Sequence, residues 1–139
     1  MKLLLVFLIF CSSILLAAPK YVNSYLIAPK SNLRWAKLSH SHLFKAKLQH
    51  SNLSGADFSK SDLSKANLSS INGSWANFAK ANLRGANLKN AKLVGATFKY
   101  ANLRNANLSG ANLSGARFDF ATWTDGTKCK IKSLAGCRK

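Results

Sequence analysis

A period of five dominates the arrangement of apolar and polar positions along the chain. From 31 to 125 the sequence advances through nineteen units of five residues without one insertion or deletion. Each unit holds a small residue, a polar residue, a large apolar residue and two variable residues, as in 81–85. This period fits neither an α-helix, at about 3.6 residues per turn, nor a flat strand, at about two. It predicts a chain that turns a corner every five residues and points its small and large residues inward.

The inward positions are nearly constant. Seventeen of the nineteen third positions are Leu or Phe, and the first positions comprise fourteen Ala, four Ser and Ile71. Asn occupies the second position ten times. The pattern resembles the A-[DN]-L-x-x repeat of the pentapeptide-repeat family, over residues 31–125. The resemblance implies an all-β fold, the right-handed quadrilateral β-helix with four repeats per coil. Nineteen repeats at four per coil give about 4.75 coils.

Large aromatic residues test the four-sided fold independently. Phe occupies the third position at intervals of twenty residues, the length of one coil with four sides of five. A column of equal side chains favours close packing, because each layer then meets a neighbour of its own size. We therefore predict a structural core column of Phe58, Phe78, Phe98 and Phe118. One repeat departs from the pattern, since Ile71 stands at its small position and Gly73 at its large one. An exchange of volumes would keep the core filled; the alternative is a cavity.

The first eighteen residues differ from the rest and predict a signal peptide at 1–18. Lys2 precedes an apolar run at 3–10, which is too short for a membrane span of about 20 residues. Cleavage is expected near Ala17 or Ala18, to within a few residues, and an uncleaved anchor is the alternative. Phe10, directly before Cys11, does not suit a lipidated cysteine, so a lipoprotein is not expected. The signal peptide predicts a periplasmic or secreted protein.

The ends of a solenoid are open sheet edges and need covering. We expect an N-terminal cap at 19–30 and a basic C-terminal cap at 126–139, on either side of the β-helix at 31–125. Without the signal peptide only Cys129 and Cys137 remain, and a pair of cysteines in an exported chain favours a disulfide. Two free thiols are the alternative. Family members often dimerise end to end, and a stapled C-terminal segment that blocks this surface favours a monomer.

Charge biases the choice of partner. The chain has 21 Lys and Arg against four acidic residues, a net charge of +17. Such a charge favours a polyanion such as anionic lipid, lipopolysaccharide, an acidic glycan or nucleic acid. Folding the sequence at twenty residues per coil gathers cations on one side, which is the predicted polyanion-binding surface. The alternative is that charge only serves solubility. The predicted binding residues are Lys45, Lys60, Lys65, Lys80, Arg84 and Arg104.

The sequence shows no catalytic constellation, so we predict neither an enzyme nor a cofactor or metal site. His40, His42 and His50 have no acidic or cysteine partner nearby in the pattern, and solvated histidines are the simpler interpretation. We expect an exported, non-enzymatic scaffold with an unidentified protein partner, or alternatively a polyanion-binding protein. Some members of the resembled family are acidic DNA mimics that bind gyrase and related topoisomerases. The opposite charge and the signal peptide argue against that role here.

Overall fold

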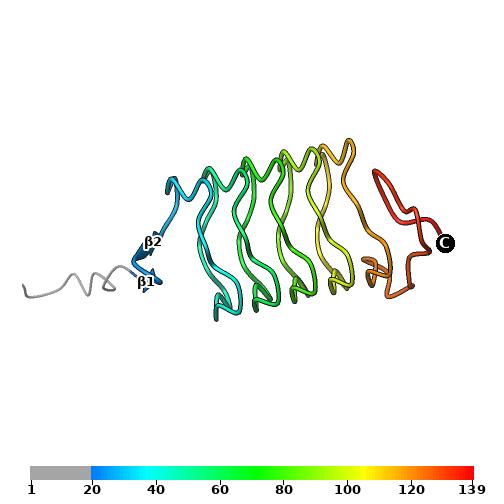
Figure 1. The fold of residues 1–139 in the computed structure, drawn as a ribbon, viewed down its shortest axis with the longest axis horizontal. Coiled ribbons are helices and arrows are strands. Elements are labelled where there is room, and N and C mark those ends of the chain that lie inside the picture. Colours follow the sequence, from blue (N-terminus) through cyan, green and yellow to red (C-terminus); the bar gives the residue numbers. More distant parts are fainter. Residues whose placement is uncertain (1–19) are drawn as a thin grey trace, which may run out of the picture.

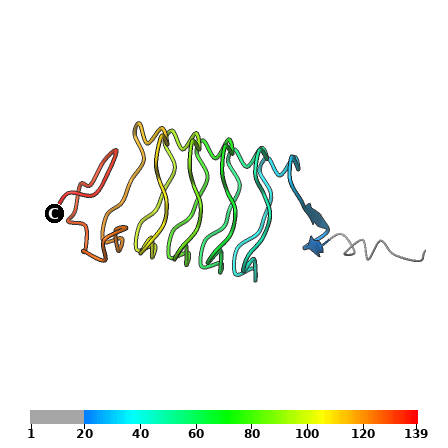
Figure 2. The same ribbon diagram turned by 180° about the vertical axis from the view of Figure 1, so that it is seen from behind.

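The computed structural model describes residues 20–139, so the predicted signal peptide at 1–18 and Cys11 lie outside the described residues. The described chain forms an N-terminal hairpin, a stack of coils and a C-terminal segment, in that order along one axis (Figure 1). The view from behind shows the same succession, with the hairpin and the C-terminal segment at opposite ends (Figure 2). Among residues 20–139, no helix is long and apolar enough to cross a membrane.

Successive coils pair in parallel with a register of twenty residues. Asn32 bridges Asn52, Asn52 bridges Asn72, and the same pairing recurs on every side of the solenoid. Around each bridge the backbone donates from one coil to the next, as from Leu33 N to Asn52 O at 2.8 Å and from Trp35 N to Ser54 O at 3.0 Å. The polar second residue of each repeat is therefore the point at which neighbouring coils are joined.

A tight turn closes each side. Ala36 N donates to Leu33 O at 3.0 Å, and the fifth residue of the repeat, Trp35, has a φ of 59°. A positive φ at this position alone is the signature of a type II turn. The fifth residue of every repeat from 31–35 to 116–120 shares the positive φ. Because the corner occupies two residues of each five, a side contributes one bridging residue rather than a long strand.

The interior consists of the first and third residues of the repeats, which are buried along most of the rod. The four phenylalanines form one continuous stack. Their ring centroids are 5.4, 5.0 and 4.9 Å apart in chain order, with interplanar angles of 5°, 9° and 2°. Parallel stacking at these centroid distances lies within the range that aromatic pairs favour. The inter-coil ladder imposes this geometry, because it places each ring directly above the previous one. The stack comprises Phe58, Phe78, Phe98 and Phe118.

The irregular repeat keeps the core filled. A Cβ at Gly73 would lie 3.4 Å from Cδ1 of Ile71 and 2.9 Å from Cδ2 of Leu93. The isoleucine at the small position therefore reaches into the space that the missing large residue would fill. Ile71 itself is buried. The two positions have exchanged volume, as a closely packed interior requires.

A hairpin closes the N-terminal end of the described chain. β1 (Lys20–Val22) and β2 (Tyr25–Ile27) pair antiparallel. Asn23 and Ser24 join them, both with positive φ, which is the conformation of a two-residue type I′ turn. Ile27 is buried in the core cluster. The hairpin thus places apolar side chains against the first coil.

The C-terminal segment covers the other end only in part. It pairs antiparallel with the last coil at Arg117 and at Thr122, which belong to adjacent sides. Leu108 and Leu113, on the remaining sides, stay half-buried rather than buried. Within residues 20–139 their amide groups donate no backbone hydrogen bond. The segment expected to cover the last coil therefore lies against two of its four sides.

Two features fasten the C-terminal segment. A disulfide joins Cys129 to Cys137, eight positions further on, and Cys129 is buried in the core cluster. Asp119 provides the second attachment. Its buried carboxylate accepts a hydrogen bond from Ser133 N at 3.1 Å. Asp119 stands at an outward repeat position, and no local pattern distinguishes it from the other outward residues, because its burial depends on where the C-terminal segment lies.

Candidate polyanion-binding side

One side of the solenoid carries the predicted cations. We define the basic side as the face formed by 41–45, 61–65, 81–85 and 101–105, together with the corners that border it. The structure brings all six predicted residues to this face, and all six are exposed. They are Arg84 and Arg104 on the face, Lys45 and Lys65 on one corner, and Lys60 and Lys80 on the other.

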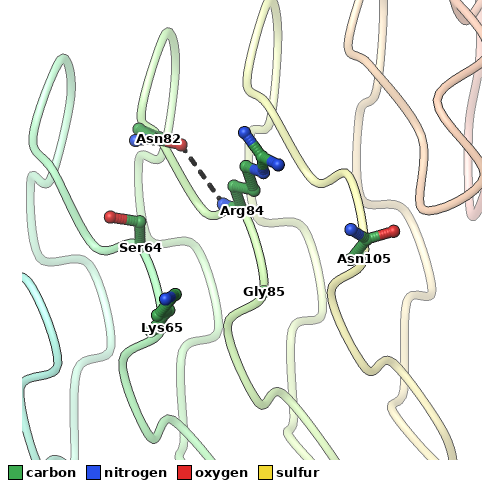
Figure 3. Close-up of a pocket in the computed structure, with 6 residues that line it drawn as sticks. All are labelled: Ser64, Lys65, Asn82, Arg84, Gly85 and Asn105. Carbon is green, nitrogen blue, oxygen red and sulfur yellow. Dashed lines mark hydrogen bonds between the residues drawn. The ribbon is translucent and has the colours of Figure 1, made fainter.

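A shallow recess of about 490 Å³ lies in the middle of this face. Figure 3 shows Arg84 and Lys65 projecting at the recess from neighbouring coils. Three polar side chains complete the lining and were not among the predicted residues. They occupy the same side when the sequence is folded at twenty residues per coil, so the pattern could have identified them had polar as well as charged residues been considered. These are Ser64, Asn82 and Asn105, and Gly85 also lines the recess.

Local turn chemistry fixes the backbone around the recess. Asn82 Oδ1 accepts a hydrogen bond from Arg84 N at 3.3 Å (Figure 3). This is an Asx-type contact, in which a side chain caps the backbone two residues on. Gly85 adds space at the corner, since a Cβ there would lie 3.7 Å from Cγ of Lys65. The aliphatic stem of Lys65 therefore packs over the glycine and leaves its charged end free to reach outward.

The cations of the basic side have no carboxylate partners. Within residues 20–139 the ion pairs join Asp119 to Lys99 and Arg117, and Asp125 to Lys139. None of the six predicted residues takes part in these pairs. Like charges one coil apart repel each other, and solvent and salt screen that repulsion only partly. An anion bound along the face would therefore gain attraction from several cations at once.

Asp62 is the acid on this face, and its role is to hold a turn. Its carboxylate accepts hydrogen bonds from the hydroxyl of Ser64 at 2.6 Å, the Ser64 amide at 3.0 Å and Asn82 Nδ2 at 3.1 Å. The Ser64 hydroxyl is the main cause of a pKa below the ordinary value for this carboxylate, against an opposing effect of burial. Asp57 makes the equivalent contact to the Ser59 amide at 2.9 Å. Both acids thus occupy the structural place that Asn fills elsewhere.

Aromatic rings border the basic side. Lys45 Nζ lies 5.2 Å from the ring centroid of Phe44, and Lys80 Nζ lies 5.9 Å from that of Tyr100. Both distances are within the range of cation–π attraction. Tyr100 also stacks on Phe120, with centroids 5.1 Å apart. The arrangement combines cations with flat apolar surfaces at the margins of the face.

The three histidines lie on the surface of the solenoid, and His42 bridges Asp62 of the next coil. His40, His42 and His50 are exposed. Across residues 20–139, no group of three or more His, Cys, Asp or Glu side chains is placed to hold a metal ion.

Comparisons with known proteins address the family. The model for pentapeptide repeats matches with eight copies, over residues 31–69, 74–110 and 91–122. A pentapeptide repeat protein from the thylakoid lumen of Arabidopsis thaliana is 34% identical, with a TM-score of 0.50 over 68% of this chain and 63% of that one. Rfr23, a pentapeptide repeat protein from the cyanobacterium Cyanothece 51142, is 35% identical, with a TM-score of 0.44 over 67% and 64%. No curated protein sequence matches the chain.

A more distant structure shares the fold alone. QnrB1, a plasmid-mediated fluoroquinolone resistance protein, is 20% identical, with a TM-score of 0.50 over 68% of this chain and 61% of that one. The chain spans less than two thirds of the length of each of these three structures. The family match covers more than half of the chain, and its repeats coincide with the coils. This chain therefore belongs to the pentapeptide repeat family, whose fold is the right-handed quadrilateral β-helix.

Proposed function

We propose that this protein is an exported, non-enzymatic scaffold that presents a fixed surface to a partner. The repeating ladder supports a rigid surface, because every coil is hydrogen-bonded to its neighbours at each side. The disulfide between Cys129 and Cys137 supports a location outside the cytoplasm, where such bonds persist. A relative at 34% identity comes from the thylakoid lumen, which is also an extracytoplasmic compartment. Periplasm or secretion is the expected destination.

A specific observation favours a second, sharper function: binding of a polyanion on the basic side. Six exposed cations lie on one side of the solenoid, two of them at the recess, and none of them is paired with a carboxylate of the described chain. A protein that used charge only for solubility would gain nothing from gathering cations on one face. The net charge of +17 is opposite to that of a DNA mimic. QnrB1 shares only the fold with this chain, at 20% identity, so no role in fluoroquinolone resistance is extended from it.

The test measures binding of the purified protein to anionic phospholipid vesicles, to a polyuronate and to single-stranded nucleic acid. Neutral phospholipid vesicles serve as the uncharged reference. The decisive variant is Lys60→Ala/Lys80→Ala/Arg84→Ala/Arg104→Ala. Its matched control removes four exposed lysines from other sides, as Lys37→Ala/Lys47→Ala/Lys89→Ala/Lys92→Ala. Both variants lose the same charge and leave the core untouched.

Binding through the basic side predicts a clear difference between the two variants. The wild type and the control should bind anionic probes and release them as salt is raised, whereas the basic-side variant should bind far more weakly. Equal losses in both variants would show that net charge alone is responsible and would refute the site. No binding by the wild type would refute the polyanion function and leave the scaffold with an unidentified protein partner.

A further inference from the structure

Two tryptophans lie exposed on a different corner of the solenoid. Trp35 and Trp75 are fifth-position residues, and their exposed fractions are 64% and 69%. They occupy equivalent positions two coils apart. Large apolar side chains exposed to this extent on a rigid element are typical of contact surfaces, especially when the residue is tryptophan.

Each indole lies flat on a glycine of the next coil. A Cβ at Gly55 would be 2.2 Å from both Cε3 and Cζ3 of Trp35, and a Cβ at Gly95 would be 2.5 Å from the same atoms of Trp75. Only glycine leaves room for the ring at these places. The inner face of each indole is therefore held against the backbone. Both rings stay largely exposed, and the Arg34 guanidinium lies 5.8 Å from the Trp35 ring centroid. The two rings form an ordered platform along the corner.

The spacing of the platform follows from the coil. Neighbouring coils lie about 4.8 Å apart, so the two equivalent indoles are separated by about 9.6 Å. This is close to the length of a disaccharide unit in an extended β-1,4-linked polysaccharide. In such a chain alternate sugars present the same face, so two sugars of one chain can stack on both indoles at once.

The surface beside the platform is polar, and its cations lie toward the two ends: Arg34 Cζ lies 5.8 Å from the ring centroid of Trp35, and Lys37 and Lys92 are exposed nearby. Segments 51–59 and 71–79 hold the residues that flank the corner in the two middle coils, and neither contains Lys or Arg. Oδ1 of Asn52 and of Asn72 accepts a hydrogen bond from the backbone amide two residues further on. Within residues 20–139, the side-chain amide nitrogen of neither residue donates a hydrogen bond. On the other flank Asp57 uses Oδ1 for its turn and for Asn77, while Oδ2 has no partner in the described chain. These groups can bind hydroxyls.

We propose that this corner binds a neutral β-1,4-linked polysaccharide. The C–H groups of a β-linked sugar ring carry slight positive charge and pack on the negative face of an indole. Sugar hydroxyls can accept from the free amide groups of Asn52 and Asn72 and donate to Asp57. A polyanion would gain less here than on the basic side, because the Asp57 carboxylate flanks the middle of the corner and segments 51–59 and 71–79 hold no cation. The site is separate from the basic side, so its success or failure does not depend on the polyanion function.

The test is a binding assay with insoluble cellulose, a β-1,4-linked glucan, and with insoluble starch as the α-linked reference. The wild type should bind cellulose and not starch. Trp75→Ala should weaken binding about tenfold or more, the scale expected for one stacked ring. Tyr100→Ala/Phe120→Ala is the matched control, since it removes two exposed, stacked aromatic residues from another corner. It should bind like the wild type.

A register variant tests the spacing itself. Trp75→Gly/Gly95→Trp keeps both tryptophans but separates them by three coils, and Gly115 is available to support the indole introduced at position 95. If the disaccharide repeat sets the affinity, this variant should bind as weakly as Trp75→Ala. Wild-type binding by the register variant, equal binding to starch, or failure of the wild type to bind cellulose would each overturn the proposal. Unchanged circular dichroism of each variant shows that the solenoid is intact.

Discussion

Replacement of Phe78 by Ala tests whether the aromatic column holds the rod together. Phe78 has no solvent exposure and lies between Phe58 and Phe98, with ring centroids at 5.4 and 5.0 Å. Removal of a buried phenylalanine costs about 3–5 kcal/mol, and the cost is highest where the site cannot collapse. Here collapse is opposed by the ladder, since Phe78 N donates to Thr97 O at 2.7 Å. We expect a loss of about 4–5 kcal/mol in the free energy of unfolding.

The assay is urea denaturation followed by far-ultraviolet circular dichroism. A loss below about 2 kcal/mol would refute the reasoning, because it would show that neighbouring coils close the cavity freely. A double-mutant cycle separates stacking from burial. Phe58→Leu and Phe78→Leu remove rings in contact and should show a coupling of about 0.5–1.5 kcal/mol. Phe58→Leu and Phe118→Leu remove rings that share no stacking partner, and their effects should add to within about 0.5 kcal/mol.

Three further predictions follow from the ends, the carboxylates and the irregular repeat. Cys129→Ser/Cys137→Ser should lower stability by about 2–3 kcal/mol, the chain-entropy value for so short a loop, and should expose the last coil to protease. Acid should destabilise the protein as pH falls below about 3.8, the pKa of an unperturbed Asp. In the folded protein Asp62 and Asp125 have lower pKa values, because the Ser64 hydroxyl and Lys139 respectively stabilise their charged forms. Denaturation midpoints measured at several pH values should show this loss, and Asp62→Asn should flatten the profile. Ile71→Ala and Gly73→Leu should each destabilise alone, while the double variant should recover most of the loss in thermal unfolding, and additive losses would contradict an exchange of volume.

Much of the fold could be predicted from the sequence because one constraint repeats. Each side must bury one small and one large residue, so the five-residue period appears directly in the chain, and the twenty-residue spacing of Phe58 and its successors predicts the number of sides. The single bridging residue per side was not predicted. It follows from the corner, whose hydrogen bond occupies backbone that a longer strand would need.

The ends and the corners were harder to predict, for a different physical reason. The cap leaves Leu108 and Leu113 partly open, and no local pattern encodes which sides a non-repeating segment covers. The contact of Trp35 with Gly55 joins residues twenty apart through the absence of a side chain. A glycine at a corner is first interpreted as a turn residue. That it also leaves room for an indole to pack against the backbone is visible only in three dimensions. The six cations could be predicted because the twenty-residue period alone assigns each charged residue to a side of the solenoid. The contacts of a side chain cannot be assigned in this way.

The stack of four phenylalanines has a consequence for how a gene of this kind can change in length. Insertion or loss of twenty residues adds or removes one ring from the column and leaves every later side chain on its own side. A change of five residues preserves the repeat motif but rotates all that follows by one corner, so phenylalanines would meet leucines and the indoles would leave their glycines. The heritable unit of growth in this protein is therefore the coil, although the unit that recurs in its sequence is the pentapeptide.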